Sequence, residues 1–244
     1  MKEVLAHIEM KKQEFAKSEF FQFLQDKSIP PRQRLAFAPC FAPFVMGFGE
    51  LNRYIWRDEP TNDPIQAIIN QHTYEDDGHW VWFLEDLKKL GFDISSDFTD
   101  TFRFIWSKEL QVSRQTFYEI YRCTYKANPI HKLIAIEAIE ATADIFLSTT
   151  GQIAKELELA SDIVCKYFGE HHFSIDSNHS IDSVESVESI SNIKLEKDVE
   201  KEALELVNQM FDLFSRFVDV LLDYAKTYEF DSSLKENSSI LNVA

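Results

Sequence analysis

The sequence predicts an all-α protein, built as a single bundle of about seven helices. Only 6 glycines and 7 prolines occur in 244 residues, so turns are few and the elements between them must be long. An apolar fraction of 45% with 21 phenylalanines is typical of a chain that buries a substantial core. Apolar residues also recur at the 3.6-residue period of an α-helix, most clearly from residue 195 to 228.

The first half of the chain is expected to contain three helices, over residues 2–26, 32–56 and 64–90. The second is very apolar, and Pro39 and Pro43 are expected to kink it. The third begins where an N-cap-like residue precedes Pro64, which suits the first helical position. Gly91 is well placed as its C-terminal cap.

The second half is expected to contain four more helices, over residues 97–108, 113–127, 130–159 and 195–228. The longest can bend around residues 148–151. Residues 161–180 have no clear assignment, and the serine-rich, acidic residues 183–192 form either a surface loop or a frayed helix. The polar tail, 231–244, is expected to be disordered, which leaves residues 1–230 as one helical domain.

Charge and cysteine content exclude several classes of function. The net charge of -16 argues against nucleic-acid binding, which needs a basic face, and against an anionic membrane surface. The three cysteines are scattered and form no C-x-x-C pair, which favours a reducing compartment over a zinc site or a disulfide framework. We find no signal peptide and no apolar run of about 20 residues. A soluble, cytoplasmic protein is expected.

Three short stretches carry metal-ligand residue types at helical spacing: His72–His79, Glu137–Glu140 and His172–His179. Positions i, i+3, i+4 and i+7 share one side of a helix, so each stretch can direct its side chains toward a single point. One such cluster would mean little. Three clusters on separate segments, with no thiolate among them, indicate a metal centre of carboxylates and imidazoles inside a helical bundle.

Each of the first two clusters also has a structural interpretation. The stretch His72–His79 can equally be the solvated side of an acidic helix. Gly78 within it costs about 1 kcal/mol relative to alanine in mid-helix, which close packing or a nearby ligand would explain. Small and apolar residues surround Glu137 and Glu140, and a carboxylate buried there must be paired or bound to metal.

The third cluster lies in a serine-bearing stretch whose composition favours a flexible loop. Tyr167 and Phe168 upstream indicate that at least its start packs against the core. Both observations are reconciled if the segment becomes helical when it binds a metal, because ligand bonds supply ordering free energy.

The stretch Tyr167–His179 resembles the signature of the heme-oxygenase-like diiron oxidases, relatives of the TenA-type thiaminase fold. The family pattern H-x3-D-x2-H is matched by His172, Asp176 and His179. The family also carries a glutamate roughly thirty residues earlier on a core helix, where Glu140 stands. Its first core helix carries an acid followed about two turns later by a histidine, and His79 fits as that histidine.

This chain departs from the pattern at one position. Seven residues before His79, where members of the family commonly have glutamate, it has His72. Either His72 is itself a ligand, or Glu75, Asp76 or Glu50 supplies the missing carboxylate. The expected ligand set is therefore His72, Glu75, His79, Glu140, His172, Asp176 and His179.

The resemblance implies a heme oxygenase-like bundle that binds two non-heme iron ions, with manganese as the alternative metal. It also implies an oxidoreductase that uses dioxygen on a small organic substrate, such as an amino acid or a fatty acid. Tyr74, Trp80 and Phe83 lie on neighbouring turns and are candidates to line the substrate cavity. The expected partners are the substrate and dioxygen, with a second copy of the chain as a candidate in a homodimer.

Three other functions remain open. A metal-free hydrolase of the TenA kind needs a nucleophilic cysteine, for which Cys123 is the candidate. A heme-binding protein needs an axial histidine on the first helix, where His7 stands among charged residues. The third is a non-catalytic binding protein that keeps only the fold.

Overall fold

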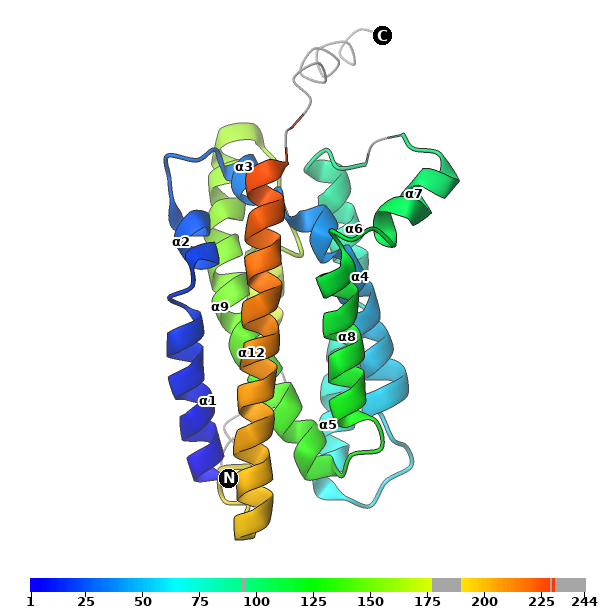
Figure 1. Cartoon of the computed structure of the whole chain (residues 1–244), viewed down its shortest axis with the longest axis vertical. Helices are drawn as coiled ribbons and strands as arrows, with labels where there is room; N and C mark the ends of the chain where they lie inside the picture. The colour runs from blue at the N-terminus through cyan, green and yellow to red at the C-terminus, as the bar shows by residue number, and fades with distance from the viewer. Residues whose placement is uncertain (94, 177–189, 229, 231–244) are drawn as a thin grey trace, which may run out of the picture.

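Helices that run along one long axis make up the body of the molecule (Figure 1). The computed structural model describes residues 1–93, 95–176, 190–228 and 230, and among these there are no strands. The prediction of an all-α protein is confirmed. No helix in the described part of the chain is both long and apolar enough to cross a lipid bilayer.

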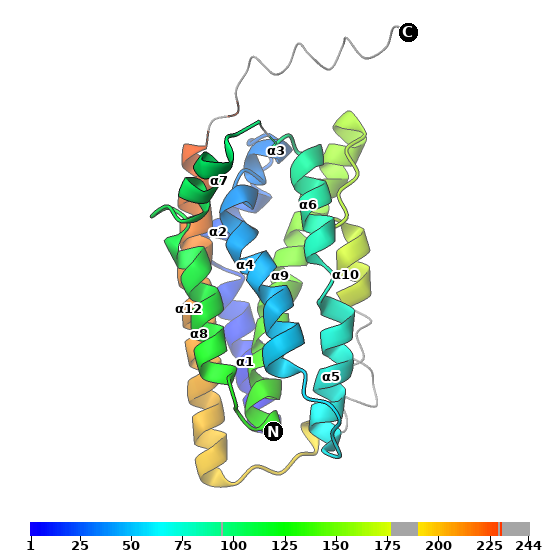
Figure 2. The same ribbon diagram turned by 90° about the vertical axis from the view of Figure 1, so that its right-hand side faces the viewer.

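The longest helix, α9 (Pro129–Ser161), is the central element of the fold. It contacts α1 (Lys2–Phe15) and α12 (Lys197–Thr227) on one side. It also contacts two helices that carry predicted ligands, α5 (Pro64–Asp76) and α10 (Glu170–Asp176). Figure 2 shows α5 and α10 together on the side of the bundle away from α12.

Phenylalanine rings from several helices form the interior. Phe41 of α4 (Ala38–Leu51) lies 5.0 Å from Phe146 of α9 and 5.5 Å from Phe217 of α12, between ring centroids. Phe37, just before α4, makes an edge contact with Phe146 at 5.7 Å. Such ring pairs add about 0.5–1.5 kcal/mol each beyond the area they bury. The phenylalanine-rich composition therefore serves one continuous core.

The prediction of one helix over residues 2–26 is wrong, because α1 ends at Phe15 and α2 spans Glu19–Gln25. Phe15 and Leu24 are both buried, yet nine residues are about 2.5 helical turns, which would put these side chains on opposite sides of a continuous helix. The break allows both to reach the core.

The prediction of one kinked helix over residues 32–56 is also corrected. The segment forms α3 (Pro31–Arg34), α4, and a π-helical turn, η1 (Asn52–Trp56). Pro39 stands in the first turn of α4, where its missing N–H would have no partner within the helix. Pro39 therefore stands at the start of a helix and does not kink one. Pro43, as expected, lies inside a helix, α4.

The third predicted helix, 64–90, is interrupted at residues 77–79, between α5 and α6 (Trp80–Lys89). Gly78 therefore lies in a turn and not in mid-helix, and a Cβ atom added to it would meet nothing within 4 Å. Of the two explanations offered for this glycine, close packing is wrong. Gly91 does follow α6 with φ of 77°, the left-handed conformation that the predicted cap requires.

The later helices agree better with prediction. α7 (Phe98–Ile105), α8 (Gln111–Thr124) and α12 lie where they were expected. α9 continues without a break through residues 148–151, where the hydroxyl groups of Ser148, Thr149 and Thr150 donate hydrogen bonds to carbonyls three or four residues earlier. The serine-rich stretch up to residue 189 and the tail 231–244 lie outside the described residues.

Removal of the N-cap of α5 should weaken the helix that carries His72. The Asp63 carboxylate accepts hydrogen bonds from the N–H groups of Ile65 and Gln66, at 2.8 and 3.0 Å. We expect Asp63→Ala to lower the free energy of unfolding by about 1 kcal/mol in urea denaturation.

The matched control is Asp97→Ala, because Asp97 is the N-cap of α7 but makes no capping hydrogen bond through its side chain. This variant should change the free energy of unfolding by less than about 0.5 kcal/mol. Equal effects of the two substitutions would contradict the capping role of Asp63.

Candidate metal centre

Helix α5 places His72 and Asp76 one turn apart on its buried face. The two side chains are 0% and 4% exposed, and His72 Nε2 lies 3.2 Å from Asp76 Oδ2. The i, i+4 spacing explains why they meet. A buried carboxylate requires a partner of opposite charge or a metal ion. His72 and Asp76 therefore form a buried polar pair inside the apolar core.

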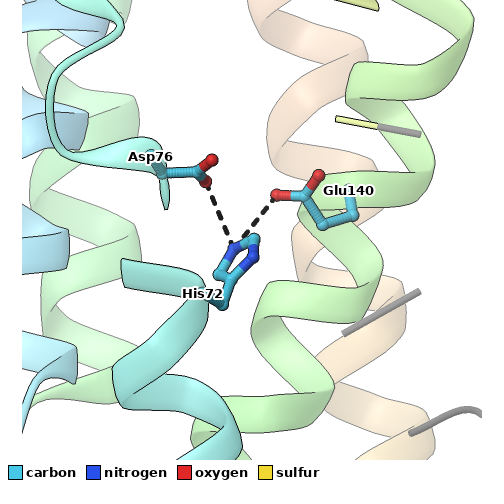
Figure 3. Close-up of side chains that lie close together, drawn as sticks. All are labelled: His72, Asp76 and Glu140. Atoms are coloured by element: carbon cyan, nitrogen blue, oxygen red, sulfur yellow. Dashed lines mark ion pairs between the residues drawn. The ribbon is translucent and has the colours of Figure 1, made fainter. Parts of the chain in front are cut away.

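Helix α9 brings Glu140 to the same point. Its Oε1 atom lies 3.5 Å from His72 Nε2, and its side chain is 16% exposed. Figure 3 shows the imidazole of His72 facing the two carboxylates from the two helices. One ligand atom from each of His72, Asp76 and Glu140 lies within 4.8 Å of the other two.

His79 reaches this centre from the turn that separates α5 from α6. It is the N-cap residue of α6 and is buried, with Nδ1 3.8 Å from Asp76 Oδ1. The two oxygens of Asp76 therefore face different histidines, Oδ2 toward His72 and Oδ1 toward His79. The interruption that the sequence did not predict thus lies beside one of the predicted ligands.

His172 completes the described part of the centre from α10. Its Nε2 atom lies 2.9 Å from His79 Nδ1, and its Nδ1 lies 2.9 Å from the carbonyl oxygen of Tyr167. A carbonyl only accepts hydrogen bonds, so Nδ1 must carry the proton. The lone pair of a neutral His172 is then on Nε2, directed toward the centre, as a metal ligand requires.

Asp86 of α6 positions the segment that leads into α10. Its fully buried carboxylate accepts the backbone N–H groups of Lys166, Tyr167 and Phe168, at 2.8, 2.8 and 3.0 Å. Burial raises the pKa of Asp86, while these hydrogen bonds act in the opposite direction. The Tyr167 carbonyl in turn contacts His172 Nδ1. The Asp86 carboxylate therefore fixes the orientation of His172 indirectly, through the backbone of Tyr167.

Aromatic rings support the two outer histidines. The ring of His79 stacks on Trp82, with centroids 4.5 Å apart and an interplanar angle of 21°. The ring of His172 lies 4.6 Å from that of Tyr167. Packing of this kind restricts the rotation of the imidazoles, so the centre is largely organised before any ligand arrives.

The carboxylates decide the protonation of His72. Burial acts to lower the pKa of His72, but the charges and hydrogen bonds of Asp76 and Glu140 outweigh burial and hold it well above its ordinary value. A charged imidazole between two carboxylates partly balances the buried charge. A divalent cation would supply the same balance more completely, after displacing the proton.

The donor set fits a transition metal. Atoms that bind one ion at about 2.0–2.2 Å lie about 3 Å from each other. The spacings from His72 Nε2 to Asp76 and Glu140, 3.2 and 3.5 Å, are close to this value. Imidazole and carboxylate donors without thiolate suit iron, manganese or zinc better than copper(I) or an iron–sulfur cluster.

Of the seven predicted ligands, His72 and Glu140 converge with Asp76. His79 and His172 lie beside this group, His79 next to Asp76 and His172 next to His79. Glu75 is half-buried on α5 and does not belong to the converging group of His72, Asp76 and Glu140. The side chain of Asp176 and the whole of His179 lie outside the described residues.

Asp76 stands at the centre of the described group, although it entered the sequence analysis only as an alternative carboxylate. The other alternative, Glu50, is exposed on α4. The i+4 relation to His72 was the available signal. Asp86 was missed, because its role depends on a segment 80 residues away that no local pattern reveals.

Only one of the three aromatic residues that were expected to line a substrate cavity lies at the cavity beside the centre. Trp80 does line a cavity beside the centre, together with Asp76, His79, Glu140 and His172. Tyr74 is 57% exposed and donates a hydrogen bond to Glu59. Phe83 is buried and packs edge-on against Tyr167, outside the cavity lining. Of the three candidates, Trp80 therefore lies at the cavity beside the centre, and Tyr74 and Phe83 do not.

No known family model matches the chain, and no curated protein is significantly similar to it. The geometry of the centre is therefore the basis for assigning a function.

Loss of the Asp86 carboxylate should both destabilise the fold and disturb the centre. We expect Asp86→Ala to lower the free energy of unfolding by about 2–4 kcal/mol, because three buried N–H groups lose a charged acceptor. Metal affinity should fall by about 10–100-fold, as for other residues that orient a ligand. Urea denaturation and metal titration measure the two effects.

Glu85→Ala is the matched control. Glu85 precedes Asp86 and forms an exposed ion pair with Lys166 of the same segment, at 2.8 Å. Such a surface pair contributes about 0–1 kcal/mol. An Asp86 variant no less stable than this control would contradict the positioning role.

Proposed function

We propose that the protein is a metal-dependent oxidoreductase of the heme-oxygenase-like diiron kind, which uses dioxygen to oxidise a small organic molecule. The observation that carries this proposal is the buried convergence of His72, Asp76 and Glu140 from α5 and α9. His79 adjoins this group through Asp76, and His172 of α10 adjoins it through His79. Such sets of carboxylates and histidines on facing helices are the usual way for a bundle to hold two iron or manganese ions.

The placement of Asp76 supports two metal ions over one. His72 and Glu140 lie on the side of its Oδ2 atom, and His79 with His172 on the side of Oδ1. A carboxylate with one oxygen toward each donor group can bridge two ions. If the family resemblance holds, Asp176 and His179 would complete the ligands on the side of His79 and His172.

The residues of the chain would have distinct tasks in this function. Bound ferrous ions would supply electrons to dioxygen, which does not react readily with closed-shell organic molecules. Asp76 and Glu140 would balance the positive charge of the ions, and the Tyr167 carbonyl would keep the proton of His172 on Nδ1. The surrounding phenylalanines exclude water, which strengthens every electrostatic interaction at the centre.

No observation favours the metal-free hydrolase. Burial raises the pKa of the Cys123 thiol, which opposes formation of the nucleophilic thiolate. Its sulfur lies 3.8 Å from Gln209 Oε1, and Cys123 is not among the residues that line the cavity. The heme alternative is likewise unsupported, because His7 Nε2 is hydrogen-bonded to Asn208 Oδ1 at 2.8 Å.

Anaerobic titration with ferrous iron tests the proposal. We expect about two ions per chain in the metal-free protein, and loss of at least one of them in both Glu140→Ala and His172→Ala. His171→Ala and Glu158→Ala are controls, since both side chains are exposed. His171 is next to His172 on α10, and Glu158 is a carboxylate of α9 about five helical turns from Glu140. Iron analysis after gel filtration gives the stoichiometry.

Binding of two ions in the controls, with loss in the ligand variants, would support the diiron proposal. A single tightly bound ion would replace it with a mononuclear centre. Absence of specific binding would contradict it and leave the non-catalytic interpretation.

A further inference from the structure

A cavity of about 80 Å³ adjoins the metal centre and extends between α1, α4, α9 and α12. Its walls are mainly rings, contributed by Phe41, Phe44, Phe48, Phe146, Phe214 and Phe217. Aliphatic side chains, among them Val45, Ile139 and Leu221, fill the spaces between the rings. Close-packed interiors contain few voids, so a cavity directly beside the ligand set requires explanation.

The charged and imidazole groups that line this cavity, those of Asp76, His79, Glu140 and His172, all belong to the candidate metal centre. Tyr167 and Trp80, whose rings each carry one polar group, also line it. Thr142 also lines the cavity, but its hydroxyl already donates a hydrogen bond to the carbonyl of Ile139 at 2.7 Å. No lysine or arginine lines the cavity in the described part of the chain. The cavity therefore combines the candidate metal centre with a mainly apolar body.

We infer that the centre acts on a slim, neutral, mainly apolar molecule whose single polar end faces the ligand set. This inference rests on the proposed function and names its substrate class. The apolar body offers no partner for a carboxylate or an ammonium group, and an unpaired charge buried there would cost several kcal/mol. A zwitterion such as a free amino acid does not match these walls.

The volume also limits the ligand. The cavity is about half the size of the ~150 Å³ engineered apolar cavity that binds benzene. The buried part of the ligand should therefore be a short or narrow chain and not a multi-ring system. A six-carbon chain has at least as many non-hydrogen atoms as benzene, so its entry would already require rotation of the lining phenylalanines.

The inference is tested on the metal-free protein with 1-hexanol and norleucine as probes. Both have six carbon atoms, but norleucine carries two opposite charges. Isothermal calorimetry and the thermal shift of unfolding measure binding. We expect 1-hexanol to bind and norleucine to show no saturable binding.

Two substitutions fill the cavity without touching a ligand. Ala143→Leu and Val218→Leu add carbon atoms from α9 and α12, and each should weaken 1-hexanol binding by about tenfold or more. Ala141→Leu is the matched control, because Ala141 lies on α9 two residues from Ala143 but does not line the cavity. Circular dichroism confirms that each variant is folded.

Loss of 1-hexanol binding in both filling variants but not in the control supports the inference. Binding of norleucine at least as tight as that of 1-hexanol overturns it, as does unchanged 1-hexanol binding in a folded filling variant. Because the probes are added without metal, an iron titration that fails would leave this result standing. Success with iron but not with 1-hexanol would overturn the substrate class alone.

Discussion

The hydrogen bonds from the Lys166, Tyr167 and Phe168 backbone to the Asp86 carboxylate connect the two parts of the molecule that form the centre. A short helix such as α10, seven residues long, is not stable by itself. Its first turn is held because the preceding backbone is bound to α6. Without that connection, only the packing of α10 against α9 and of the adjoining aromatic rings would hold His172 beside His79.

The second requirement is electrostatic. Asp76 and Glu140 bring negative charge into an interior made largely of phenylalanine, where charge is poorly solvated. The two carboxylates hold the pKa of His72 well above its ordinary value, which favours a charged imidazole between them. A divalent ion in the proposed site would balance the same negative charge after displacing the proton. In the proposed function, the stability of the core and the affinity for metal would therefore depend on the same few side chains.

Much of the helix layout could be predicted from the sequence, but the breaks could not. The periodicity at 195–228 and the cap at Asp63–Pro64 are local signals, and both elements form as expected. The break after Phe15 is needed only because Phe15 and Leu24 must both reach one core, which is a tertiary condition. Helical spacing pointed to His72, Glu140 and His172, and the structure places His72 beside Glu140, and His172 beside His79, which lies in a turn. The i+4 spacing from His72 was a signal for Asp76, whereas no local spacing reveals Asp86 as the positioning residue.

Diffraction from crystals grown with manganese, measured at a wavelength that gives an anomalous signal, tests the metal centre most directly. The chain carries a net charge of -16, so weak binding to surface carboxylates is the natural competitor. We expect anomalous peaks in the buried space between Asp76, Glu140 and the histidines, at about 2.0–2.3 Å from ligand atoms. Peaks confined to surface carboxylates at saturating manganese, with His172 or Asp76 turned toward solvent, would contradict a metal centre in this bundle.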